Sequence, residues 1–173
     1  MDSTVGRIFS SDPEEAAFIQ NDPISTGTVR TLNIYTGLYE FINRTNWIST
    51  VEGLDDDIFE PQVRRTEIIA EAKILRALGH FYLLRNFGQF YDINSKYGIN
   101  TRLEPAKSAE AYSRDSVLET YETILNDLEY GIENGPSLRT KGYTNSTFAK
   151  GLKARVLLYM QRYSEAAIVA KEN

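Results

Sequence analysis

The sequence contains no cysteine, which excludes disulfide bonds, thiolate metal sites and cysteine nucleophiles among these residues. Histidine is almost as scarce, since His80 is the only one, and no nucleophile can be paired with it as a base. No run approaches the roughly 20 apolar residues of a membrane-spanning helix. The first residues, Met1–Thr4, lack the basic and apolar parts of a signal peptide. We expect these 173 residues to be soluble by themselves.

An excess of positive charge is also absent. The 19 lysines and arginines are outnumbered by 24 aspartates and glutamates, which gives a net charge of −5. This sign argues against binding to nucleic-acid phosphates, and we predict no nucleic-acid partner. Hydrophobic residues make up 42% of the chain and charged residues 25%, as in ordinary globular proteins. Because a domain averages about 150 residues, we expect a single domain over residues 1–173.

Helical periodicity dominates the chain, with apolar residues at three- and four-residue steps. Ser116 and Glu119 match a capping box, although Asp115 could cap that helix instead. We expect Asn145 to cap the next helix, and Gly88 to end an earlier one in the left-handed conformation. The predicted helices cover about residues 12–21, 28–49, 62–87, 116–134, 145–159 and 163–173.

Three segments depart from this pattern. Residues 51–60 hold a glycine and five acids without the spacing of an EF-hand, so we favour a solvated loop and predict no metal site. Residues 89–113 form a linker longer than most helix connections, and long ordered loops often carry function. The chain ends inside its last helix, whose apolar face then lacks a later partner. We expect a truncated architecture or a partner from another copy.

In residues 39–48, in residues 69–88 and in three stretches between 114 and 166, the chain resembles the SusD/RagB-like glycan-binding lipoproteins of Bacteroidetes outer membranes. The first is YEFINRTNWI at 39–48, similar to an early helix of the family. The second and most specific is IAEAKILRALGHFYLLRNFG at 69–88, which looks like the family's helix ending in Phe-Gly. The third comprises RDSVLETYETILNDL at 114–128, FAKGLKARVLLY at 148–159 and YSEA at 163–166, in the family's order. Where the family commonly has a proline after Phe-Gly, this chain continues with Gln89, so its loop can take another path.

The resemblance implies a SusD-like, all-α fold of tetratricopeptide-like antiparallel hairpins, stacked into a right-handed superhelix. It covers only the N-terminal part of the family's architecture. The implied function is non-catalytic: a nutrient-uptake protein captures oligosaccharide at the cell surface and passes it to a SusC-like TonB-dependent outer-membrane transporter. No cofactor is implied. Membrane association would come only through a lipid anchor on a cysteine of the full-length precursor, which these residues do not contain.

Sugar recognition requires an aromatic face for the C–H surface of the ring, with amides or carboxylates for its hydroxyls. Asn46 and Asn100 lie beside such aromatics in the sequence. For Trp47, its place on the apolar stripe of a helix favours core packing over ligand binding. The residues that we predict to bind carbohydrate are Tyr91, Asn94, Tyr97 and Trp47.

Other chemically suggestive residues are better explained by structure. His80 lies in the most apolar helix, where we expect a hydrogen-bonded structural role. Glu67 and Glu71 stand one turn apart, a spacing that could support acid-base chemistry, but Lys73 or Arg76 could equally neutralise them. Arg76 needs a buried partner, because an unpaired buried charge is costly.

A second function remains open from the sequence. The last two helices have the spacing of a tetratricopeptide unit, with Ala154 at the helix crossing, Tyr163 at the turn, and Ala166 and Ala170 facing back. Any antiparallel helical hairpin could show the same small residues. The alternative to a glycan-binding protein is therefore a tetratricopeptide-like adaptor that binds a protein partner.

Overall fold

The computed structural model describes residues 29–54, 58, 62–108, 111–137 and 142–172. The chain divides into two compact units, residues 1–37 and 38–173, which we describe separately. The described part of the first unit is the beginning of helix α2, from Val29 to Gly37. The single domain expected over 1–173 stays a prediction, and the short helix expected at 12–21 lies outside the described residues.

All regular secondary structure in the described residues is helical, which confirms the all-α prediction. No strand occurs in those ranges, and none of their helices is long and apolar enough to cross a membrane. The elements are α2 (Val29–Ser49), the 3-10 helix η1 (Thr50–Gly53), α3 (Gln62–Phe87), α4 (Val117–Asn134), α5 (Ser146–Tyr159) and α6 (Tyr163–Lys171). The acidic segment around 51–60 lies partly outside the described residues.

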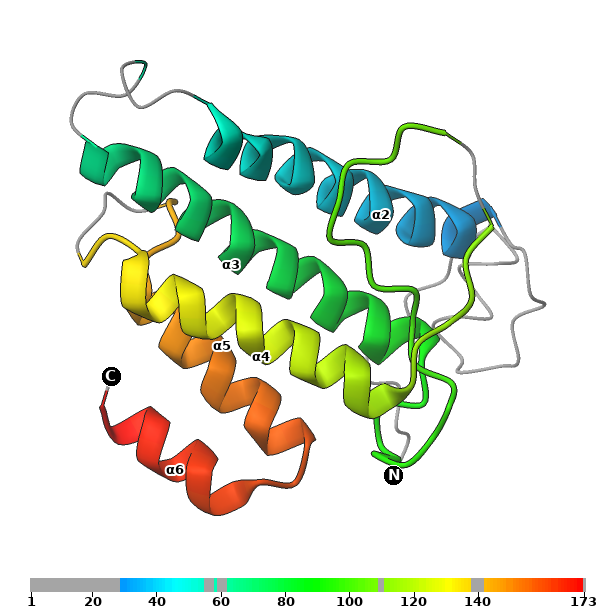
Figure 1. Ribbon diagram of the computed structural model, residues 1–173. Coiled ribbons are helices and arrows are strands. Elements are labelled where there is room, and N and C mark those ends of the chain that lie inside the picture. Colours follow the sequence, from blue (N-terminus) through cyan, green and yellow to red (C-terminus); the bar gives the residue numbers. More distant parts are fainter. Residues whose placement is uncertain (1–28, 55–57, 59–61, 109–110, 138–141, 173) are drawn as a thin grey trace, which may run out of the picture. The chain divides into compact units, whose positions relative to one another are not determined.

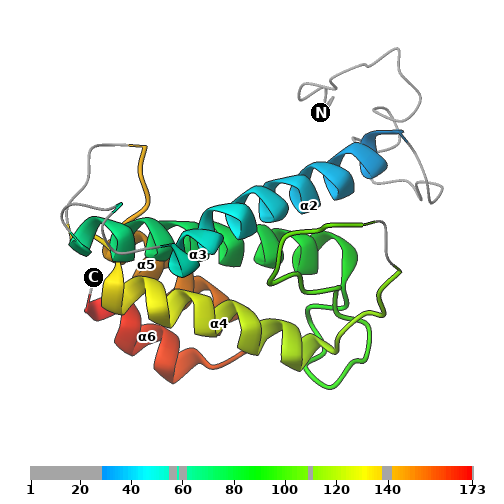
Figure 2. The same cartoon turned by 45° about the horizontal axis from the view of Figure 1, so that its top comes forward.

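The second unit is a series of helical hairpins. Helix α3 packs against α4, α4 against α5, and α5 against α6, and successive helices run in opposite directions (Figure 1). The same order is visible after rotation (Figure 2). This is the tetratricopeptide-like arrangement predicted from the sequence. In the last hairpin Ala166 is buried as expected, whereas Ala170 is exposed.

The core of this unit lies between α3, α4 and α5. Its largest fully buried side chains include Phe81, Tyr121, Leu84, Ile124 and Leu128. Each such side chain stabilises the fold by about 1.5–3 kcal/mol through removal of its surface from water. Helix α5 begins with an aromatic residue outside the core, since Phe148 is exposed in its first turn.

Helix α4 begins and ends as its sequence indicates. The Ser116 Oγ accepts a hydrogen bond from the Glu119 N–H, and the Glu119 carboxylate accepts one from the Ser116 N–H. Asp115 is therefore not the cap. The two hydrogen bonds from Ser116 hold the pKa of the exposed Glu119 carboxyl below its ordinary value. Asn145 caps α5 by accepting from the Phe148 N–H.

Two expectations about helix geometry are wrong. Gly88 is not among the residues with positive φ, and its N–H continues the helical pattern by donating to the Leu84 carbonyl. A Cβ at Gly88 would lie 2.7 Å from Leu84 Cδ1, so close packing requires the glycine. Trp47 is 52% exposed rather than part of the core. Thr45 and Asn46 occupy the buried face of α2 at that level, and Trp47 follows one residue further round the helix.

Candidate functional site

The loop between α3 and α4 is held against the helices by side chains of α2. We call residues 102–106 the strap. The Asn46 amide donates to the carbonyls of Arg102 and Glu104, at 3.1 and 2.9 Å. The Asn43 side-chain oxygen Oδ1 accepts from the Ala106 N–H at 2.8 Å. Backbone groups that lack a secondary-structure partner are thereby satisfied, which permits a long loop to be ordered.

Helix α3 holds the strap from a second direction. The Arg76 Nη1 donates to the Leu103 carbonyl and to the Asn46 side-chain oxygen, both at 3.0 Å. The other side of the guanidinium forms two hydrogen bonds with the Asp127 carboxylate of α4, at 2.8 and 2.7 Å. Arg76 therefore has the buried partner that the sequence predicted, and it joins α2, α3, α4 and the strap.

His80 has the structural role expected of it. Its Nε2 accepts a hydrogen bond from the Arg102 N–H at 3.1 Å, so the proton of the neutral ring lies on Nδ1, a buried atom with no hydrogen-bond partner. Burial, reinforced by the nearby Arg76, lowers the pKa of His80 to about 3. The imidazole is consequently neutral at physiological pH and acts as an acceptor for the strap.

The carboxylate pair Glu67 and Glu71 is neutralised by a different residue from those suggested. Arg64 Nη1 lies 3.1 Å from Glu67 Oε2 and 3.2 Å from Glu71 Oε1. The pKa of Glu71 is raised, chiefly by burial, while Arg64 opposes the shift. Arg76, by contrast, is committed to Asp127. The described residues contain no group of three or more His, Cys, Asp or Glu side chains that could hold a metal ion.

The residues predicted to bind carbohydrate come from two parts of the fold, since Trp47 lies on α2 and the other three lie on the α3–α4 loop. Tyr91, Tyr97 and Trp47 are all at least half exposed, and Lys96 Nζ lies 5.3 Å from the centroid of the Tyr97 ring. Asn94 donates its backbone N–H to the Asp92 carboxylate. The neighbouring amides are engaged elsewhere, because Asn46 holds the strap and Asn100 donates to the Ser113 carbonyl.

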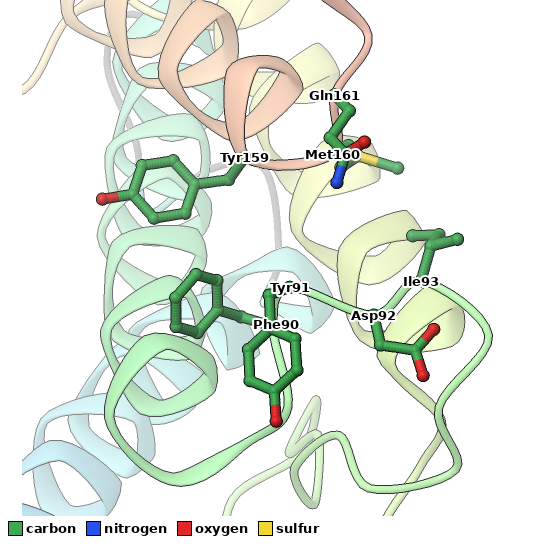
Figure 3. A pocket seen from close by; sticks show the side chains of 7 residues that line it. All are labelled: Phe90, Tyr91, Asp92, Ile93, Tyr159, Met160 and Gln161. Carbon is green, nitrogen blue, oxygen red and sulfur yellow. The ribbon is translucent and has the colours of Figure 1, made fainter.

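Of the four predicted residues, Tyr91 lines a pocket among the described residues. The pocket has a volume of about 290 Å³ and lies between the start of the α3–α4 loop and the turn from α5 to α6. Figure 3 shows the rings gathered on one side and the remaining side chains on the other. We call it the loop-turn pocket, and its lining residues are Phe90, Tyr91, Asp92, Ile93, Tyr159, Met160 and Gln161.

An aromatic cluster forms one side of the loop-turn pocket. The rings of Phe90 and Tyr91 meet edge to face with centroids 5.6 Å apart, and the Phe90 ring lies 5.6 Å from that of Tyr159. Tyr159 in turn packs edge to face on the buried Phe81 at 5.2 Å. Such contacts fix ring orientations. The cluster connects the pocket directly to the core of the second unit.

Tyr121 of α4 holds the loop side of the pocket in place. Its hydroxyl donates to the Phe90 carbonyl at 3.0 Å, although the two residues are 31 positions apart. Burial, with a contribution from Tyr159, raises the pKa of Tyr121 to about 12. The phenol therefore stays protonated and remains a donor throughout the physiological range.

The α5–α6 turn supplies the other side of the pocket. Gln161 has a φ of 62°, in the left-handed region that residues with a Cβ rarely adopt. The N–H of Arg162 donates to the Leu157 carbonyl, and that of Gln161 to the Leu158 carbonyl. These are the two hydrogen bonds of a Schellman motif, in which glycine is the usual residue at the left-handed position. The turn is well defined but strained at Gln161.

Comparison with known proteins identifies the family. The family model SusD-like_3, described as "Starch-binding associating with outer membrane", matches residues 4–158. This chain belongs to the SusD-like family.

Individual relatives of this SusD-like chain are considerably longer. A SusD-like protein of Bacteroides ovatus is 28% identical over 126 residues, which are 72% of this chain and 21% of the relative. The crystal structure of a SusD superfamily protein from Bacteroides thetaiotaomicron has a TM-score of 0.74 and 27% identity, over 80% of this chain and 30% of that one. A laminarin binding SusD-like protein has a TM-score of 0.64 and 25% identity, over 79% and 28%. The chain thus spans less than a third of these relatives.

Sequence reasoning missed most of the pocket in this SusD-like chain. Asp92, Tyr159 and Gln161 were not among the candidates, and only their convergence in space distinguishes them. One local signal was available for Gln161, since the turn between two predicted helices at 160–162 contains no glycine. A tight turn without glycine requires another residue to adopt its positive φ.

Proposed function

We propose that this SusD-like chain is the helical part of a non-catalytic protein that binds oligosaccharides for nutrient uptake. The observation that carries the proposal is the family match over residues 4–158. The laminarin binding relative, whose described ligand is a glycan, supports it. The exposed aromatics of the α3–α4 loop are suited to stack on sugar rings, as the residue chemistry requires.

We further propose that the protein acts at the outer-membrane surface. There it would hand the captured glycan to a SusC-like TonB-dependent transporter, held in place by a lipid anchor on the full-length protein. The family description, which places its members with the outer membrane, supports this location. A transporter hand-off also gives a binding protein without catalytic residues a role in uptake.

Binding is tested by isothermal titration calorimetry of the protein with laminari-, malto- and xylogluco-oligosaccharides. We expect saturable binding of at least one of these neutral glycans and no release of new reducing ends during incubation. Failure to bind any oligosaccharide, together with saturable binding of a soluble protein partner, would replace the proposal with the tetratricopeptide-like adaptor. Hydrolysis of a bound glycan would overturn the non-catalytic part alone.

The transporter step needs a separate experiment. The protein, carrying an affinity tag, is purified from detergent-solubilised outer membranes of the source bacterium. We expect a TonB-dependent transporter to co-purify in stoichiometric amount, and the yield to be independent of added glycan if the two form a standing complex. Recovery of the tagged protein from membranes without any transporter would contradict the hand-off while leaving glycan binding intact.

A further inference from the structure

We propose that the loop-turn pocket is a subsite for one neutral sugar ring of the bound glycan. The inference rests on the proposed function and adds to it a location and a selectivity. The volume of about 290 Å³ is just below the range for small-molecule sites, about 300–1,000 Å³. That size suits a single ring of an oligosaccharide rather than a long segment of chain.

The aromatic side of the pocket offers the surface that a sugar ring requires. Tyr91 is 64% exposed, so much of its ring is available to the C–H groups of a pyranose. Its orientation is set by the edge-to-face contact with Phe90, whose carbonyl is held by the Tyr121 hydroxyl. The Phe90 part of this platform is held by the Tyr159 ring and by the Tyr121 hydroxyl before ligand arrives, which reduces the entropy lost on binding.

The lining of the pocket also offers polar groups with no partner among the described residues. One Asp92 oxygen accepts from the Asn94 N–H, whereas no hydrogen bond or ion pair to the other is found there. The Gln161 side-chain amide and the Tyr91 hydroxyl are likewise without a partner. A carboxylate oxygen accepts, an amide donates and accepts, and a phenol does both. This combination matches the donors and acceptors of sugar hydroxyls.

Charge gives the subsite its selectivity. Asp92 is the one ionised side chain among the residues that line the pocket. A uronic acid or a sulfated sugar would bring a second negative charge next to this carboxylate, and like charges in close contact are costly. A neutral hexose carries no such cost. The pocket therefore selects against acidic glycans.

Backbone strain at Gln161 supports a binding role for its side chain. Glycine would occupy the left-handed position of this turn without steric cost, yet the chain places a glutamine there. Strained residues of this kind cluster at binding sites, where the side chain gained offsets the conformational cost. In the loop-turn pocket that side chain is an amide, which lies with Met160 across the site from the Tyr91 ring (Figure 3).

The test compares neutral laminaribiose with cellobiouronic acid as calorimetric probes of the protein and its variants. We expect wild type to bind laminaribiose at least tenfold more tightly than the acidic disaccharide. Tyr91→Ala and Gln161→Gly should each weaken laminaribiose binding about tenfold. Asp92→Asn retains an acceptor for the Asn94 N–H, so it should keep the neutral ligand and gain about tenfold for the acidic one.

Phe148→Ala is the matched control, because Phe148 is also an exposed aromatic but begins α5, whereas the pocket lies at the other end of that helix. It should change neither affinity by more than twofold. If wild type binds laminaribiose or a longer neutral glycan, and Tyr91→Ala and Gln161→Gly both retain that binding, the subsite is overturned and the proposed function stands. An absence of binding by wild type to every oligosaccharide would overturn both. Thermal melts of each variant confirm that it is folded.

Discussion

Arg76 and Asp127 form a two-point ion pair between α3 and α4, with each side chain only 7% exposed. The Arg76 Nη1 group donates instead to the Leu103 carbonyl of the strap and to the Asn46 side-chain oxygen. Burying two charges is costly, and the cost is recovered only when the geometry is good and the remaining donors are satisfied. Here both conditions hold, so the pair specifies how three helices and a loop meet.

Arg76→Met is expected to lower the free energy of unfolding by about 3–5 kcal/mol, because it leaves the Asp127 carboxylate buried without a partner. The double variant Arg76→Met/Asp127→Leu removes both charges and should recover most of that loss. Urea unfolding monitored by circular dichroism measures each value. A loss below about 1 kcal/mol for the single variant would mean that water reaches the carboxylate and that the pair is not effectively buried.

His80 predicts a pH dependence of stability with a definite sign. The folded protein holds the imidazole neutral down to about pH 3, whereas the unfolded chain takes up the proton near pH 6.5. Between these values the unfolded state binds more protons, so the free energy of unfolding falls as pH falls from 6.5 towards 3. In this pH range His80 alone should change the free energy of unfolding by up to about 1.4 kcal/mol per pH unit.

A His80→Gln variant isolates that contribution. Glutamine can present an oxygen to the Arg102 N–H in place of Nε2 and does not titrate. Urea titrations of both proteins at several pH values between 4 and 7 give the difference in slope. Equal slopes would show that His80 is not the group responsible.

Gly131 and Gly37 both lie within helices, but we expect their replacement by alanine to change stability in opposite directions. A Cβ at Gly131 would collide with Ile74, whose side chain is fully buried and cannot move away. We expect Gly131→Ala to cost about 1–3 kcal/mol. Gly37 in α2 has nothing within 4 Å of its Cβ position, so Gly37→Ala should stabilise the helix by up to about 1 kcal/mol. Thermal unfolding of the two variants checks the signs, and destabilisation by both would contradict this account.

Gln161 makes a prediction about strain that is independent of any ligand. Gln161→Gly removes the Cβ from a left-handed residue and should raise the free energy of unfolding by about 0.5–1 kcal/mol, after the greater freedom of glycine in the unfolded chain is counted. Gln161→Ala keeps the Cβ and should leave stability nearly unchanged. Chemical denaturation of the pair measures the difference, and equal stability of the two would show that the turn carries no strain.

The parts of the structure that depend on local chemistry could be predicted from the sequence. The Ser116 cap needs a residue three positions away, and the helix periodicity needs the next turn, so both are visible in the chain itself. Trp47 was misplaced because its neighbours Thr45 and Asn46, which are polar, take the buried face of α2. Asn46 is buried there because its side chain holds the strap, and that contact spans more than 50 residues.

The loop-turn pocket could not be predicted for a similar reason. Tyr91 and Gln161 come to line one pocket only after the helices between them have packed, and no periodicity in the sequence links them. The family resemblance was recognised because it depends on the same buried helix faces that the structure confirms. A family match does not locate a subsite on loops that differ between members. The pocket can therefore be found only in the three-dimensional structure.

The strap also bears on the order in which the molecule assembles. Its hydrogen bonds to α2 join residues 56, 58 and 63 positions apart, whereas Ser116 and Glu119 are three apart. Closing a long loop costs conformational entropy before its contacts can stabilise the chain. Contacts between residues so far apart in the sequence therefore form late in folding. The same contacts should open first when the native state fluctuates. The core of α3, α4 and α5 would then act as a preformed template, and the strap would close over it as the final step.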